Sequence, residues 1–143
     1  MSDTFEGTNP HISDRYITRE IAGEILTMGQ VVELTTADQT VKKPTTSPGN
    51  KPSGVCITSA ALGKSVSVLW RGRVRAKAYG TITVGDCITS GPGGTIQTRA
   101  AISATDLTGT SAAIAAILNT ERSIMGICEI GAASGASAVI FLT

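Results

Sequence analysis

The clearest pattern along the chain is an alternation of apolar and polar side chains over residues 65–79. The even positions carry only apolar or small side chains, and most of the odd positions carry serine, arginine or lysine. A period of two places alternate side chains on opposite faces, as in a strand that buries one face. The pattern therefore predicts one long strand, with a bend or bulge at Gly72 near its middle.

Shorter β-runs separated by turn residues lie on both sides of this strand. Residues 31–34 and 54–58 are two such runs, and the proline-rich stretch 44–52 between them predicts a loop. Residues 86–89 and 95–98 flank a glycine-rich turn, which predicts a hairpin. These runs together predict an all-β fold.

One segment, residues 111–119, has the composition of a helix. It is rich in alanine and isoleucine, and Thr110 or Ser111 can serve as its N-cap. A helix this short is not stable alone in water, so we expect it to dock against another surface.

The last strand candidate, residues 136–142, is apolar on both faces. Val139 and Phe141 point to one side, whereas Ile140 and Leu142 point to the other. A strand buried on both faces lies either inside a core or at a subunit interface. We predict Val139 and Phe141 as oligomer-interface residues, and a sandwich interior fits the same pattern.

Two stretches of the chain echo each other. Residues 54–69 and residues 126–141 both contain a strand, a turn with two alanines and a glycine, and an alternating strand. This echo predicts a β-domain over residues 29–143 built from two similar halves, at about 29–70 and 84–143. A pseudo-symmetric barrel or a sandwich would accommodate two such halves.

The first 28 residues differ from the rest. Five carboxylates against two arginines give this stretch a net charge of −3, and its hydrophobic periodicity is not sustained. Residues 16–26 suit either a short helical turn or a docked extended segment. We expect residues 1–28 to form an extended N-terminal arm.

The composition narrows the class of protein. The 143 residues suit one domain, and a net charge of +1 indicates neither nucleic acid nor membrane as a partner. The sequence has no apolar run of the roughly 18 residues that a membrane span needs, and its start lacks the pattern of a secretory signal. Aromatic residues make up only 3%, so each strand buries little area and oligomerisation or docking supplies part of the stability.

Catalytic and metal-binding patterns are weak. His11 is the only histidine and lies in the expected arm, and the three widely spaced cysteines match no zinc pattern. An odd number of cysteines favours a reduced, cytoplasmic protein. The turn at residues 91–94 lacks the ending of a phosphate-binding loop. We therefore expect no enzyme activity and no cofactor.

Charge segregation is the strongest functional signal. Residues 40–85 contain eight lysines and arginines but no aspartate or glutamate, and four of the cations share one face of the long strand. A solvated sheet face explains this pattern, and so does an acidic partner surface, such as the arm of a neighbouring copy. Nucleic acid is disfavoured because alternation places Trp70 on the opposite face.

The segment "GDCITSGPGGTIQ" at residues 85–97, followed by "MGICEIGAASGASAVIFL" at residues 125–142, resembles the bacteriophage head decoration (capsid cement) proteins. This resemblance implies a small β-barrel or β-tulip-like domain, usually trimeric, that sits at symmetry points on a capsid. Some members reach their neighbours through an extended N-terminal arm. The family has no short signature through which functional residues could be transferred, and the helix and the arginine-rich strand depart from its pattern.

On this basis we expect a structural virion protein that docks on the outside of a phage capsid and stabilises it by bridging capsomers. Its partners would be the major capsid protein and itself, as a homotrimer, and it would be made in the host cytoplasm. The alternatives are another virion module, such as a tail or fibre component, or a small-ligand-binding β-barrel. The residues predicted to bind partners are Phe5, Tyr16, Ile17, Ile21, Arg71, Arg73, Arg75 and Lys77.

Overall fold

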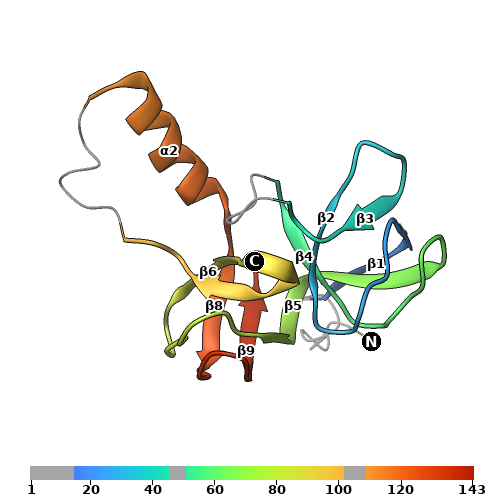
Figure 1. The fold of residues 1–143 in the computed structure, drawn as a ribbon. Helices are drawn as coiled ribbons and strands as arrows, with labels where there is room; N and C mark the ends of the chain where they lie inside the picture. Colours follow the sequence, from blue (N-terminus) through green and yellow to red (C-terminus); the bar gives the residue numbers. More distant parts are fainter. Residues whose placement is uncertain (1–14, 46–50, 102–108) are drawn as a thin grey trace, which may run out of the picture.

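A computed structural model describes residues 15–45, 51–101 and 109–143 of the chain. These residues form mostly β-structure with one short helix, as the alternation predicted (Figure 1). The strands are β1 Tyr16–Ala22, β2 Val31–Leu34, β3 Thr40–Lys42, β4 Ser53–Cys56, β5 Ser65–Lys77, β6 Cys87–Ser90, β7 Ile96–Thr98, β8 Ile124–Ile130 and β9 Ser137–Leu142. The helix is α2 Ser111–Arg122, and a short 3-10 turn, η1 Pro92–Gly94, joins β6 to β7.

Five of the strands close into a β-barrel. Their hydrogen-bonded order is β1-β3-β2-β4-β5, and β1 also pairs with β5, which completes the ring. Most neighbours are antiparallel, but β1 runs parallel to β3. The fold class is therefore a closed barrel with additional strands.

The long strand β5 is shared between this barrel and the remaining strands. Its first part pairs with β1 and β4, and its second part pairs with β9, so that the sheet continues as β5-β9-β8-β6-β7. Gly72, where the change occurs, has a φ of 123°, a conformation that side-chain-bearing residues rarely adopt. The β1–β5 register also shifts here, opposite Leu69 and Arg71. The bend predicted at Gly72 therefore lies at the junction, and Figure 1 shows the two groups of strands on either side of β5.

The two groups of strands repeat one another in their local hydrogen bonds. Before β2, the backbone N–H of Thr27 donates to Gln30 Oε1 at 2.9 Å, and before β6 that of Thr83 donates to Asp86 Oδ2 at 3.0 Å. We call residues 16–70 the first unit and residues 72–142 the second unit. The boundaries expected from the sequence, 29–70 and 84–143, stay a prediction.

The equivalence extends to bridges between distant segments. Leu26 pairs with Ala60 in the first unit, and Ile82 pairs in the same antiparallel manner with Ala132 in the second. Ala78, directly after β5, pairs in parallel with Ile96 of β7, so the additional strands β5-β9-β8-β6-β7 also come round to meet, and we call them the second barrel. Positions before residue 45 correspond to positions 55 or 56 residues later, and positions in 51–70 correspond to positions 72 residues later. This correspondence allows the surroundings of equivalent residues to be compared.

Two hydrophobic clusters form the core. The first lies inside the first unit and consists of Ala22, Leu26, Val32, Val41, Cys56, Val66 and Val68. The second is larger and consists of Val31, Val55, Leu69, Ala76, Ala78, Ile82, Ile88, Ile96, Met125, Cys128, Ala138, Ile140 and Leu142. Three members of this larger cluster come from the first unit, so the two units pack against each other.

The expected arm over residues 1–28 differs from what the structure describes. Residues 16–22 form β1, which pairs with both β3 and β5, and Ala22 and Leu26 are buried in the core. The docked extended segment considered for residues 16–26 therefore agrees with β1, and only Ala22, the last residue of this strand, is fully buried. Residues 1–14 lie outside the described residues.

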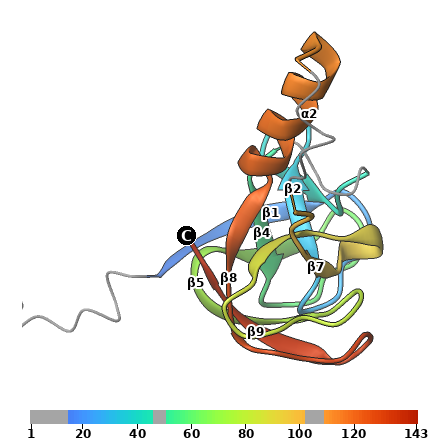
Figure 2. The same cartoon turned by 90° about the vertical axis from the view of Figure 1, so that its left-hand side faces the viewer.

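The helix α2 extends away from the barrel in both views (Figures 1 and 2). Its N-cap is Thr110, whose Oγ1 accepts a hydrogen bond from the backbone N–H of Ala113 at 3.1 Å. Ile114 and Leu118 remain exposed, so the described surface does not provide the docking expected for this helix. None of the described helical segments is long and apolar enough to cross a membrane.

Candidate interaction surfaces

The basic face predicted on β5 is exposed. Arg71, Arg73, Arg75 and Lys77 all project to solvent, which follows from their odd positions along an alternating strand. Arg73 forms an ion pair with Glu129 on β8, so one of the four cations already has a counter-charge within the chain. The remaining cations keep the face basic.

The two residues predicted at an oligomer interface differ in their exposure to solvent. Val139 is only 7% exposed, whereas Phe141 is 45% exposed, although both lie on the same face of β9. Each pairs with an arginine on β5, Val139 with Arg75 and Phe141 with Arg73. Only Phe141 is therefore available to a partner.

Three of the four partner-binding residues predicted near the N-terminus lie on β1. Tyr16, Ile17 and Ile21 are exposed, so they remain available to a partner. Phe5 lies outside the described residues.

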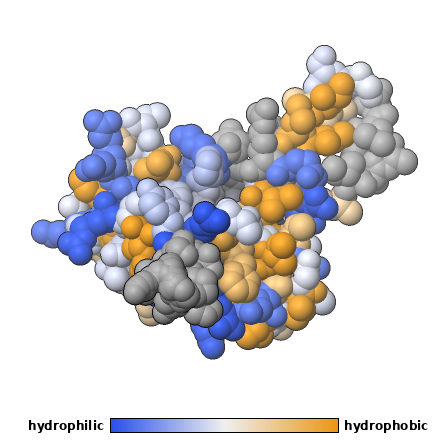
Figure 3. All heavy atoms as spheres, turned by 180° about the vertical axis from the view of Figure 1, so that it is seen from behind, coloured by the Kyte–Doolittle hydropathy of each residue, from blue (hydrophilic) through white to orange (hydrophobic). Residues whose placement is uncertain are grey.

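Phe141 belongs to a larger exposed apolar surface that the sequence did not single out. Ile127 and Ile130 on β8 are each about half exposed, and Ile127 is the direct cross-strand neighbour of Phe141. Figure 3 shows hydrophobic side chains both along α2 and on the face of the molecule below it. Exposed apolar surface of this kind is typical of binding sites.

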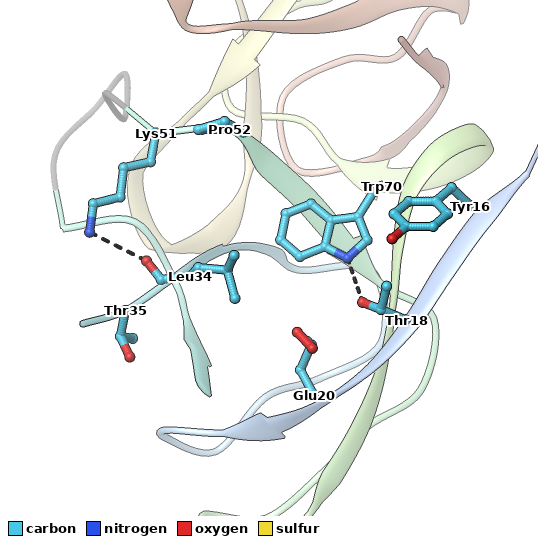
Figure 4. A pocket seen from close by; sticks show the side chains of 8 residues that line it. All are labelled: Tyr16, Thr18, Glu20, Leu34, Thr35, Lys51, Pro52 and Trp70. Carbon is cyan, nitrogen blue, oxygen red and sulfur yellow. Dashed lines mark hydrogen bonds between the residues drawn. The ribbon is translucent and has the colours of Figure 1, made fainter. Parts of the chain in front are cut away.

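The first unit contains an open pocket that sequence reasoning also missed. It has a volume of about 600 Å³ and is lined by Tyr16, Thr18, Glu20, Leu34, Thr35, Lys51, Pro52 and Trp70. The Trp70 indole N–H donates to Thr18 Oγ1 at 2.6 Å, and the Lys51 ammonium donates to the Leu34 carbonyl at 3.4 Å (Figure 4). The bond to Thr18 fixes the indole, and Trp70, Leu34 and Pro52 give the pocket an apolar lining that also includes Glu20.

Potential metal ligands and nucleophiles are spread through the described residues. Within the described ranges, no three histidine, cysteine, aspartate or glutamate side chains gather where they could hold a metal ion. Burial raises the pKa of the Cys56 thiol to about 11, and burial followed by the Asp86 carboxylate raises that of Cys128. Raised pKa values make both thiols poor nucleophiles. His11 lies outside the described residues, and the absence of a cofactor and of enzyme activity stays a prediction.

This chain is similar to a known protein in its fold. No model of a known protein family matches it, and no curated protein does. Its fold is similar to a crystal structure of the N base of the head fiber gp8.5 in bacteriophage phi29, with a TM-score of 0.59 and 13% sequence identity. The match covers 90% of this chain and 94% of the phage chain. At this identity the likeness establishes a shared fold.

Proposed function

We propose that this chain is a structural protein of a bacteriophage virion, which docks on the outside of the capsid as a homotrimer and bridges capsomers. The observation that carries the proposal is the similarity over nearly the whole of both chains to a protein that is itself described as a phage head fiber base. The resemblance of residues 85–97 and 125–142 to decoration proteins supports the same location independently. The protein acts by binding, without a cofactor, and multivalent docking of three copies raises a modest single affinity.

The basic face of β5 is the proposed contact with an acidic capsid surface. Arg71, Arg75 and Lys77 are exposed, and no carboxylate of residues 40–85 competes for them. Contacts between exposed charges weaken as salt concentration rises, because mobile ions screen them over about 10 Å at 0.1 M ionic strength. Binding to heads should therefore decrease with salt.

Co-sedimentation with empty phage heads tests this contact. We expect the double variant Arg75→Glu and Lys77→Glu to bind at least about tenfold more weakly, which corresponds to about 1.4 kcal/mol. Lys42→Glu combined with Lys64→Glu is the matched control, since it makes the same charge change at exposed positions away from this face. Equal binding by both double variants would contradict the assignment of the basic face, and absence of wild-type binding would contradict capsid docking.

A fibre component is the second candidate, and the likeness to a fiber base favours it specifically. The two roles differ in what the protein does to the capsid. A cement protein that bridges capsomers raises the temperature at which heads rupture, whereas a fibre base bound within a single capsomer leaves it unchanged. Thermal disruption of heads with and without saturating protein therefore separates bridging from simple attachment.

A further inference from the structure

Each unit carries one row of three side chains, and the two rows lie at equivalent positions. Each row crosses three strands as direct cross-strand neighbours, over β2, β4 and β5 in the first unit and over β6, β8 and β9 in the second. The first row is Val31, Val55 and Leu69, and the second row is Cys87, Ile127 and Phe141. Because the pairings match, the rows occupy the same place on the two barrels.

The first row is buried, whereas the two large side chains of the second row are about half exposed. Val31 and Val55 are completely buried and Leu69 is 2% exposed. In the second row, Ile127 is 48% exposed and Phe141 is 45% exposed, although both side chains are as apolar as their counterparts. The difference therefore comes from what lies over each row and not from the residues themselves.

The second unit covers the first row. Val31, Val55 and Leu69 belong to the same hydrophobic cluster as Met125 and Leu142 of the second unit. A Cβ atom added at Gly94, in the turn between β6 and β7, would lie 3.0 Å from the Lys43 side chain, so this turn also packs against the first unit. The turn between β6 and β7 borders one end of the second barrel, and the first row closes that end.

The corresponding end of the first barrel is the open pocket. The pocket residues Glu20, Leu34 and Trp70 correspond to Ala76, Ser90 and Leu142 of the second unit. Those three counterparts are 1%, 2% and 3% exposed, whereas Leu34 is 45% exposed. Within the chain, the first row packs against the end of the second barrel. The second row and the open end of the first barrel have no such partner among the described residues.

We infer that the second row of one copy inserts into the open pocket of another copy, and so repeats between chains the contact that joins the two units within a chain. The surfaces match in chemistry, because Ile127 and Phe141 would cover the apolar part of the pocket lining around Trp70 and Leu34. Arg73, which is next to Phe141 and is paired with Glu129 within its own chain, would approach Glu20 in the pocket lining. This contact uses two different surfaces, so repetition produces a ring if the rotation closes and a filament if it does not. It gives the self-association of the proposed function an interface, but it does not rest on capsid binding.

Solution mass measured by light scattering tests the interface directly. We expect the full chain to self-associate and both Phe141→Asp and Leu34→Asp to reduce the mass to that of a monomer. Leu62→Asp is the matched control, since Leu62 is an exposed leucine in a turn outside both surfaces and should keep the wild-type mass. Far-ultraviolet circular dichroism and thermal unfolding establish that each variant is folded.

Mixing the two disabled variants gives the sharpest result. Phe141→Asp retains an intact pocket and Leu34→Asp retains an intact row, so the mixture should form a one-to-one dimer that grows no further. The dimer should also change the fluorescence of Trp70, the only tryptophan in the chain. Absence of a dimer in the mixture of folded variants would overturn the row-in-pocket contact in favour of a symmetric contact between like faces.

Other occupants of the pocket have distinct outcomes. A monomeric wild type whose Trp70 emission changes when residues 1–14 are removed would place the chain's own N-terminus there and overturn the inference. Binding of the dye 1-anilinonaphthalene-8-sulfonate by a monomeric wild type, abolished by Leu34→Asp, would instead identify a small-ligand pocket and also overturn it. Failure to bind heads with self-association intact would contradict only the proposed function.

Discussion

The two units of this molecule share a strand order and a hydrogen-bond pattern but bury different faces. In the first unit, Val31, Val55 and Leu69 on the outward face of β2, β4 and β5 are covered by the second unit, and the opposite face of these strands lines the unit's own core. In the second unit, β8 and β9 are covered on the inside but leave Ile127 and Phe141 exposed. Equivalent pairing therefore does not give equivalent burial, because burial depends on what packs against the sheet from outside.

The largest expected effect contrasts the two equivalent residues Leu69 and Phe141. Leu69→Ala should lower the free energy of unfolding by about 2–5 kcal/mol, because it leaves a cavity between the two units. Phe141→Ala should cost less than about 1 kcal/mol in the monomer, since nearly half of the side chain is already in water. Urea unfolding at a concentration that keeps the protein monomeric measures both values. Equal losses would mean that the two faces are buried alike.

Two equivalent glycines test how closely the repeated strands approach. A Cβ atom at Gly54 would lie 2.9 Å from the Leu69 carbonyl oxygen, and one at Gly126 would collide with the carbonyl of Phe141. Gly54→Ala and Gly126→Ala should each cost about 1–3 kcal/mol, because backbone must shift to make room. Chemical denaturation measures both losses. A neutral substitution at either position would show that its strand can move outward without loss of packing.

The equivalent cysteines predict a loss of stability at high pH. The Cys56 thiol has an ordinary pKa of 9.0 when unfolded, and burial raises it to about 11 in the folded protein. Between these values the unfolded state releases a proton that the folded state keeps, so the free energy of unfolding should fall as pH rises. Burial raises the pKa of Cys128 as well, so it should act in the same direction.

Urea unfolding at pH 8, 9.5 and 10.5 measures this slope. Cys56→Ala is the comparison, since it removes the thiol while lysine and tyrosine ionisation stays the same. Its slope above pH 9 should be shallower than that of the wild type. Parallel slopes would indicate that the Cys56 thiol ionises equally easily in both states.

The smallest expected effect on stability comes from an ion pair that is present in the second unit and absent at the equivalent positions of the first. Arg73 and Glu129 form an exposed ion pair in the second unit, where the first unit has Ile17 and Ile57. A double-mutant cycle with Arg73→Ala and Glu129→Ala should give a coupling of about 0.2–1 kcal/mol, because water screens exposed charges. A coupling well above this range would mean that the pair is shielded from water.

The sequence by itself determined the local features of the fold. Alternation along residues 65–79 specified β5, turn residues specified the hairpin of β6 and β7, and the two N-cap candidates Thr110 and Ser111 marked the start of α2. These features were readable because side-chain periodicity and turn chemistry depend on residues close together in the chain. The all-β class followed from them.

Only the tertiary structure decided which faces are covered. Val139 and Phe141 have the same apolar character and the same strand face, yet one is buried and the other exposed. Residues 16–22 belong to the barrel because β5, more than 40 residues away in sequence, pairs with them. Val31, Val55 and Leu69 close one end of the second barrel. No described residues close the equivalent end of the first barrel, so a pocket stays open there. Alternation shows that a strand has two different faces, but the packing of distant segments decides which face meets water.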